Sequence, residues 1–121
     1  MILFVDDEEV LRTSTREYLT LKGHTVVVAE DKAEAISMFD ELGEKIKLLI
    51  VDHQLPDGTG WQIVAHAQKT RVDIPVIYAS GYYVVPEPEG VRVVDDHIIY
   101  VPKPFEMADL LSTIDRIMPG E

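Results

Sequence analysis

The chain has 121 residues, 46% of them hydrophobic, with a formal net charge of −11 and no cysteine. This length suits one domain with one core, so we expect a single domain over residues 1–121. The lack of cysteine excludes disulfides, thiolate nucleophiles and zinc–thiolate sites, and the negative charge disfavours direct binding to nucleic acid. No apolar run reaches the roughly 20 residues of a membrane span, and the N-terminus carries no export signal, so we expect a cytoplasmic domain without membrane contact.

Short apolar runs, several rich in β-branched residues, alternate along the chain with segments of helical periodicity. Asp31, with Glu34 three residues later, predicts a capping box at the start of the second helix, and Gly43 suits its end. The predicted strands are residues 2–5, 26–29, 48–51, 74–79 and 97–101. Apolar residues at helical spacing follow in residues 10–21, 35–42, 61–67 and 107–118.

This alternation predicts an α/β fold. Strands that read as continuous apolar runs indicate a parallel sheet covered by helices on both faces. Right-handed crossovers then make a doubly wound sheet. In such sheets the functional crevice lies at the C-terminal ends of the strands, so the residues that follow the predicted strands are the candidates for a site.

Polar residues follow four of the five predicted strands, namely Asp6 and Asp7, Asp52, Ser80, and Lys103. Three carboxylates at one sheet edge would repel one another unless one stays protonated or a cation intervenes. Magnesium prefers oxygen ligands and commonly takes one or two carboxylates together with a phosphoryl oxygen. Ser80 and Lys103 suit charge neutralisation around a moving phosphoryl group, with Asp52 as the nucleophile that forms an acyl phosphate.

Four short motifs occur in order, each at the end of a predicted strand. They are Val5-Asp6-Asp7-Glu8; Ile50-Val51-Asp52 followed by Leu55-Pro56-Asp57-Gly58-Thr59-Gly60; Ala79-Ser80-Gly81; and Tyr100-Val101-Pro102-Lys103-Pro104-Phe105. On these residues the sequence resembles the receiver (CheY-like) domain of two-component response regulators, over nearly the whole chain. The resemblance implies a flavodoxin-like sheet of five parallel strands in the order 2-1-3-4-5.

The resemblance also implies a role for each residue of the phosphorylation site. Asp52 matches the phosphoacceptor, which takes its phosphoryl group from a phosphohistidine on a sensor histidine kinase or a histidine phosphotransfer protein. Asp7 matches a direct Mg²⁺ ligand and Asp6 a ligand that acts largely through water. Asp52 and the backbone carbonyl of Gln54 complete the metal site, in which Mn²⁺ could replace Mg²⁺.

Further residues match the family's phosphoryl contacts and its conformational switch. Ser80, Gly81 and Lys103 match the residues that contact the phosphoryl oxygens. Inward movement of Ser80, followed by the ring of Tyr100, would be the switching step. We therefore expect a signalling domain that assists its own phosphorylation and dephosphorylation, and not an enzyme.

Two other features are carried over from the family. The peptide bond between Lys103 and Pro104 is expected to be cis, which the small trans preference of prolyl bonds allows. Gln54 and Tyr82 would lie on either side of the acyl phosphate. We expect them to tune its lifetime, with Tyr82 shading it from water.

Residues 82–96 depart from the family pattern. Pro86 and Pro88, followed by Gly90, would break a helix there, and the flanking valines favour extended structure. We expect the family's fourth helix, which lies between the fourth and fifth strands, to be missing or shortened. Because this helix usually forms part of the family's signalling face, a monomer or weak dimer is expected. The stretch also resembles receivers of hybrid sensor kinases.

Two rival functions are considered. Asp57-Gly58-Thr59 copies the end of the D-x-D-G-T loop of haloacid-dehalogenase-type phosphatases, but the position of the nucleophile holds Leu55, which excludes that class. A degenerate receiver that acts only as a docking module remains the alternative, since a sequence cannot show that a kinase exists. His53 and His97 have no ligand-like partner in the sequence and are interpreted as structural.

Overall fold

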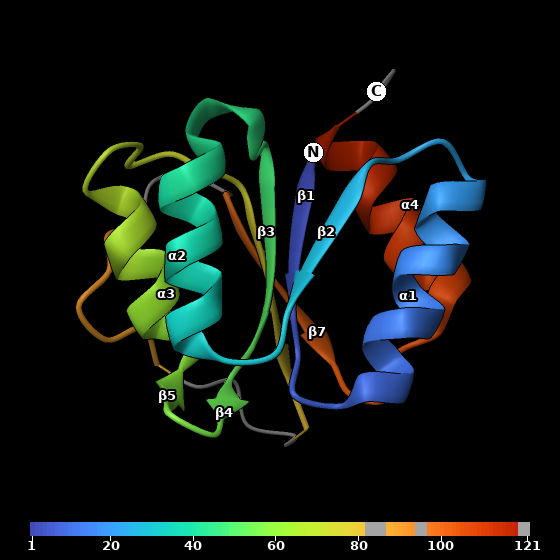
Figure 1. The fold of residues 1–121 in the computed structure, drawn as a ribbon, viewed down its shortest axis with the longest axis horizontal. Helices are drawn as coiled ribbons and strands as arrows, with labels where there is room; N and C mark the ends of the chain where they lie inside the picture. Colours follow the sequence, from blue (N-terminus) through green and yellow to red (C-terminus); the bar gives the residue numbers. More distant parts are fainter. Residues whose placement is uncertain (82–86, 94–96, 119–121) are drawn as a thin grey trace.

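A computed structural model describes residues 1–81, 87–93 and 97–118. Five parallel strands form one sheet in the order β2-β1-β3-β6-β7, which confirms the expected flavodoxin-like order 2-1-3-4-5. Figure 1 shows the sheet almost edge on, with α2 and α3 on one face and α1 and α4 on the other. The strands are β1 (Ile2–Val5), β2 (Val26–Ala29), β3 (Leu48–Asp52), β6 (Val76–Ser80) and β7 (Ile98–Pro102).

The helices cover both faces of the sheet, as the alternating pattern predicted. They are α1 (Glu9–Leu21), α2 (Lys32–Leu42), α3 (Gly60–Gln68) and α4 (Met107–Ile117), with a short 3₁₀ turn at Gly43–Lys45. Among the described helices, none is long and apolar enough to cross a membrane.

The core has two halves, one on each side of the sheet. Leu3 and Val5 of β1 pack under α2 and α3, whereas Ile2 and Phe4 of the same strand pack under α1 and α4. Successive side chains of a strand point to opposite faces, and here both faces are covered by helices. This double burial is why the strands appear in the sequence as continuous apolar runs.

The two ends of α2 follow the predicted signals with one difference. The Asp31 carboxylate accepts a hydrogen bond from the Glu34 N–H at 2.8 Å, which confirms the N-cap. The Glu34 carboxylate, however, accepts from the N–H of Glu30, one residue before the expected partner. Gly43 follows the helix with a φ of +52°, a left-handed conformation that favours glycine.

Strands β3, β6 and β7 begin or end later than predicted, and β7 covers Ile98–Pro102 in place of residues 97–101. β6 starts at Val76 and not at residue 74, because Pro75 has no N–H to donate to the ladder. β3 and β6 continue through Asp52 and Ser80, which pair with Ala79 and Pro102. Two of the candidate site residues are therefore held by the sheet itself.

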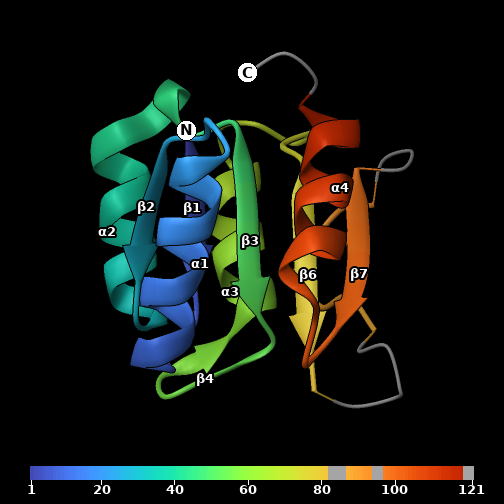
Figure 2. The same cartoon turned by 90° about the vertical axis from the view of Figure 1, so that its right-hand side faces the viewer.

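A hairpin follows β3 directly. It consists of β4 (Gln54–Leu55) and β5 (Gly58–Thr59), which pair antiparallel around Pro56 and Asp57. Figure 2 shows the arrowheads of β2, β3, β6 and β7 at one edge of the sheet, with β4 beside that edge. The strands predicted from the sequence did not include residues 54–59.

The described part of the stretch between β6 and β7 contains no helix. Residues 87–93 have no regular secondary structure, so a helix through the middle of residues 82–96 is excluded. The Arg92 N–H donates to Gln68 Oε1 at 2.8 Å, and Gln68 Nε2 donates to the Arg92 carbonyl at 2.7 Å, which fastens this segment to the end of α3. Residues 82–86 and 94–96, including Tyr82, lie outside the described residues.

Candidate functional site

A cleft of about 480 Å³ opens at the C-terminal edge of the sheet. It lies between the loops that follow β1, β3, β6 and β7, the position expected for a doubly wound fold. Most of the predicted site residues meet there. The lining residues are Asp7, Glu8, Leu11, Asp52, His53, Gln54, Ser80, Gly81, Lys103, Pro104 and Phe105.

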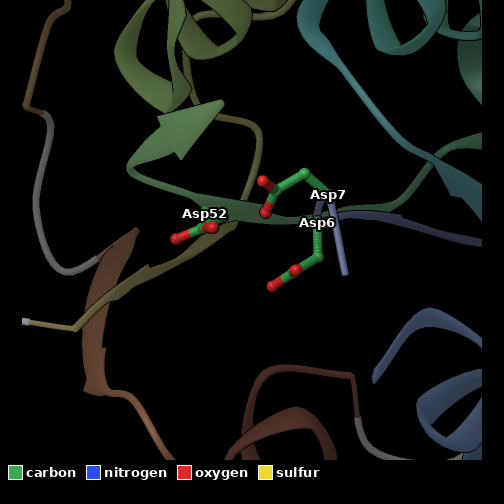
Figure 3. A group of neighbouring side chains, drawn as sticks. All are labelled: Asp6, Asp7 and Asp52. Atoms are coloured by element: carbon green, nitrogen blue, oxygen red, sulfur yellow. The ribbon is translucent and has the colours of Figure 1, made fainter. Parts of the chain in front are cut away.

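Three carboxylates gather at this cleft, two from the end of β1 and one from the end of β3 (Figure 3). One carboxylate oxygen from each of Asp6, Asp7 and Asp52 lies within 4.8 Å of the others. Asp6 is 1% exposed and Asp52 7% exposed, whereas Asp7 is open to solvent. These oxygen donors, two buried and one accessible, fit a hard divalent cation such as Mg²⁺.

Lys103 supplies the positive charge inside this cluster. Its Nζ lies 2.8 Å from Asp6 Oδ2 and 3.3 Å from Asp52 Oδ2. Burial by itself would lower the pKa of Lys103, but the hydrogen bonds and charges of the two carboxylates outweigh it and raise that pKa. Lys103 is therefore a firmly protonated cation beside Asp52.

The Asp52 carboxyl is harder to ionise than an ordinary aspartate. Burial is the largest cause and raises its pKa to about 6; Lys103 opposes this shift, and the charges of Asp6 and Asp7 add to it. The ionised form of Asp52 is thus held at an energetic cost in the metal-free protein. A cation bound between the carboxylates would lower that cost.

Asp6 links the end of β1 to the start of α1. Its Oδ1 accepts a hydrogen bond from the Glu8 N–H at 2.9 Å, just before the helix begins. Its backbone carbonyl accepts from Arg12 Nη1 at 2.8 Å. One carboxylate oxygen of Asp6 thus accepts a hydrogen bond at the start of helix α1, and the other accepts one from Lys103.

The loops after β6 and β7 bring Ser80 and Lys103 to the cleft. Ser80 is 6% exposed, and its carbonyl accepts a hydrogen bond from the Lys103 N–H at 2.8 Å. Gly81 follows at the exposed rim. The peptide bond between Lys103 and Pro104 is cis.

An aromatic cluster that the sequence did not indicate lies behind the cleft. Tyr78 of β6 is fully buried, and its ring stacks on Trp61 with centroids 3.7 Å apart. The Tyr78 hydroxyl accepts a hydrogen bond from the backbone N–H of Trp61 at 3.1 Å and forms a 2.6 Å hydrogen bond with His53 Nδ1. His53, which also lines the cleft, thus has a hydrogen-bond partner in the core. A tyrosine at an interior strand position could have signalled a buried hydroxyl in need of partners.

Tyr100 lies on β7 beside this cluster and is not among the residues that line the cleft. Its ring is edge-on to Trp61 at 6.1 Å and to Tyr78 at 6.2 Å. Partial burial raises the pKa of its hydroxyl. The ring thus contacts the core on the α3 side of the sheet, and β6 lies between its strand and the strand of Asp52.

Asp57 takes no part in the cleft. Its two carboxylate oxygens accept hydrogen bonds from the N–H groups of Lys32 and Ala33 at the start of α2. The carboxylate that copies the end of a phosphatase loop is thus engaged by a helix and not by the cleft, in agreement with the exclusion of that class.

Comparison with known proteins identifies the family. The family model described as "Response regulator receiver domain" matches residues 2–115. The chain belongs to the response regulator receiver family. As a receiver domain it is a component of two-component signalling, and receiver domains are phosphorylated by sensor kinases and bind Mg²⁺.

Similar proteins include both hybrid kinases and response regulators. The chain is 28% identical over 117 residues to "Sensor kinase CckA" of Brucella abortus (strain 2308), and 30% identical over 118 residues to "Response regulator MprA" of Mycobacterium ulcerans (strain Agy99). Each match covers 97% of this chain, which spans 12% of the kinase and 49% of the regulator.

Solved receiver structures have the same fold. The "receiver domain from Hybrid Histidine Kinase CckA" has a TM-score of 0.82 and 27% identity, with 97% of each chain covered. The response regulator TrrA of Thermotoga maritima, described as a complex with Mg(2+)-BeF, has a TM-score of 0.80 and 26% identity, again with 97% of each chain covered.

Proposed function

We propose that Asp52 is the phosphoacceptor of this receiver domain. The observation that carries the proposal is the meeting of three carboxylates with Lys103 at the C-terminal sheet edge, where Lys103 Nζ lies 3.3 Å from Asp52 Oδ2. This combination offers a nucleophile, donors for a divalent cation and a fixed positive charge. Because acidic pair, acceptor and lysine are all present, no feature of the described residues favours a docking module that carries no phosphate.

In the proposed reaction, a carboxylate oxygen of Asp52 forms a bond to the phosphorus of a phosphohistidine. The phosphorus–nitrogen bond breaks, and its electron pair stays on the imidazole. With a pKa of about 6, Asp52 is mostly ionised at neutral pH and can attack. Lys103 and the Ser80 hydroxyl would stabilise the negative charge on the transferred oxygens, since phosphoryl transfer depends mainly on positioning and charge neutralisation.

We propose that Asp7, Asp52 and the backbone carbonyl of Gln54 hold Mg²⁺ directly, and that Asp6 acts through water. The buried position of Asp6 and its short contact with Lys103 Nζ support this indirect role. Bound Mg²⁺, or Mn²⁺ in its place, would neutralise the carboxylates and the phosphoryl oxygens. The relative described as a Mg(2+)-BeF complex supports the choice of metal.

Signalling is proposed to use Ser80 and Tyr100. Movement of Ser80 toward the phosphoryl group, with Gly81 beside it, would change the space behind the cleft. Tyr100 would follow by changing the packing of its ring against Trp61 and Tyr78. Control of the phosphate lifetime by Gln54 and Tyr82, and assistance to self-dephosphorylation, stay predictions.

The proposed phosphodonor is a sensor histidine kinase or a histidine phosphotransfer protein. The similarity to a sensor kinase that contains a receiver supports this choice. Monomeric or weakly dimeric behaviour, a cytoplasmic location and the absence of direct nucleic acid binding stay predictions from the sequence. The net charge of −11 supports the last of these.

Intact-mass measurement tests the proposal. The wild-type chain and the Asp52→Asn variant would be incubated with Mg²⁺ and acetyl phosphate. We expect one added phosphoryl group on the wild type and none on the variant. A folded wild type that binds Mg²⁺ but gains no phosphoryl group, from acetyl phosphate or from a phosphohistidine protein, would contradict it.

A further inference from the structure

The β4–β5 hairpin, which carries Gln54, is fastened to helix α2 by Asp57. Asp57 Oδ1 accepts a hydrogen bond from the Lys32 N–H at 2.8 Å, and Oδ2 accepts one from the Ala33 N–H at 3.0 Å. These are first-turn N–H groups that have no partner inside the helix. The hydrogen bond from Lys32 is the largest cause that lowers the pKa of Asp57, and the one from Ala33 adds to it. The carboxylate beside the positive end of the helix dipole is therefore ionised.

The hairpin is also fixed at its base. The backbone N–H of His53 donates to the Ala79 carbonyl at 2.8 Å, and the backbone N–H of Gly60 donates to the His53 carbonyl at 3.1 Å. Figure 1 shows β4 and β5 below the end of α2 at which that helix begins. Close packing accompanies the hydrogen bonds, since a Cβ added to Gly58 would lie 3.1 Å from Lys32 Cδ. Gln54 thus lies between an anchor to the sheet and an anchor to α2.

We propose that Asp57 is a positioning residue for the metal centre, which fixes the backbone of Gln54 by tying the hairpin to the first turn of α2. This inference rests on the proposed function, in which the Gln54 carbonyl binds the metal. Without the tie, the hairpin would have to be ordered when the metal binds, and that ordering would weaken affinity. Because coupling is reciprocal, metal binding should also strengthen the tie and slow hydrogen exchange at Lys32 and Ala33.

Asp31 offers a matched control. Its carboxylate caps the same helix, accepting from the Glu34 N–H at 2.8 Å, but it belongs to the segment before α2 and not to the hairpin. Asp57→Ala and Asp31→Ala therefore each remove one carboxylate cap from α2. Only Asp57→Ala also releases the hairpin that carries Gln54.

The test compares Mg²⁺ dissociation constants of the wild type and both variants by calorimetry. For Asp57→Ala we expect the Mg²⁺ dissociation constant to rise about threefold to tenfold. Loss of a residue that orients a metal ligand typically costs about 10- to 100-fold in affinity, and we expect a smaller effect here because Asp57 is exposed. Asp31→Ala should stay close to the wild type. Asp57→Asn, which keeps one acceptor oxygen, should lie between Asp57→Ala and the wild type. Equal constants for the two alanine variants would overturn the inference.

Amide exchange measured by NMR gives a second readout that loss of a helix cap alone would not change. Mg²⁺ should slow exchange at Lys32 and Ala33 in the wild type and in Asp31→Ala, and should have no such effect in Asp57→Ala. A wild type that binds Mg²⁺ and is phosphorylated, but shows no such slowing, would overturn the inference alone. A wild type that neither binds Mg²⁺ nor accepts a phosphoryl group would overturn the proposed function as well.

Discussion

The buried carboxyl of Asp52 should destabilise the metal-free protein at neutral pH, so the Asp52→Asn variant should be more stable than the wild type. The pKa of this carboxyl rises from 3.8 to about 6 on folding, mainly because of burial. At 1.36 kcal/mol for each pKa unit, ionising it in the folded state costs up to about 3 kcal/mol. Asparagine has nearly the same shape and carries no charge, so it avoids this cost.

Solvent reduces the expected gain, because the cleft is open to water, which screens the charge. The attraction between Asp52 and Lys103 Nζ at 3.3 Å is already included in the pKa of about 6. We therefore expect Asp52→Asn to raise the free energy of unfolding by about 1–2 kcal/mol at pH 7. A carboxyl whose pKa is raised by folding makes its full contribution to the stability of the folded state below pH 3.8, and this contribution is lost as the pH rises through about 6. The advantage of the variant should thus shrink by more than half at pH 4.

Urea unfolding in the presence of a chelator measures this difference. Trp61 is the single tryptophan of the chain and is 1% exposed, which makes its fluorescence a reporter of the core. The exposed residue Asp73 provides the control, since Asp73→Asn makes the same chemical change at the surface. Saturating Mg²⁺ should stabilise the wild type more than Asp52→Asn. A variant that is no more stable than the wild type at pH 7, or equally favoured at pH 4 and pH 7, would refute the reasoning.

Other substitutions test the aromatic cluster, the close packing and the cation. Tyr78→Phe removes the hydroxyl that is hydrogen-bonded to His53 and to the backbone N–H of Trp61, and should lower the free energy of unfolding by about 1–3 kcal/mol in urea denaturation. An unchanged free energy of unfolding would contradict the role of these bonds. Gly60→Ala would place a Cβ 2.6 Å from the Asp52 carbonyl oxygen, so we expect a loss of about 1–3 kcal/mol by thermal unfolding, and an unchanged midpoint would speak against this contact. Lys103→Ala removes the cation beside Asp52 and should slow phosphorylation by acetyl phosphate about 10- to 100-fold, measured by intact mass over time; a wild-type rate would exclude the proposed role of Lys103.

The sheet could be predicted because both of its faces are buried. Residues 2–5 and 26–29 were predicted with the bounds of β1 and β2, since apolar runs there end abruptly at acids or turns. The start of β6 was wrong by two residues, because burial continues through Ile74 while Pro75 cannot join the ladder. Hydrophobic pattern reports burial, whereas strand bounds depend on hydrogen bonds.

For the candidate site, too, some features could be predicted from the sequence and others could not. The residues that meet at the site could be predicted because each ends or follows a strand of a parallel sheet, and the fold brings these strand ends to one edge; they are Asp6, Asp7, Asp52, Ser80 and Lys103. No sequence pattern indicated the individual hydrogen bonds that Tyr78 and Asp57 form with other elements. The hydrogen bonds of Tyr78 and of Asp57 connect residues at least 17 positions apart, and they depend on the register of the folded chain.

Identification of the phosphorylated residue tests the proposed chemistry most directly. The wild-type chain would be phosphorylated with acetyl phosphate and Mg²⁺, reduced with borohydride and digested for tandem mass spectrometry. Borohydride reduces an aspartyl phosphate to homoserine, so we expect homoserine at position 52 and aspartate at positions 6 and 7. Homoserine at either of those two positions, or unmodified Asp52 in a chain whose intact mass has gained a phosphoryl group, would contradict Asp52 as the phosphoacceptor.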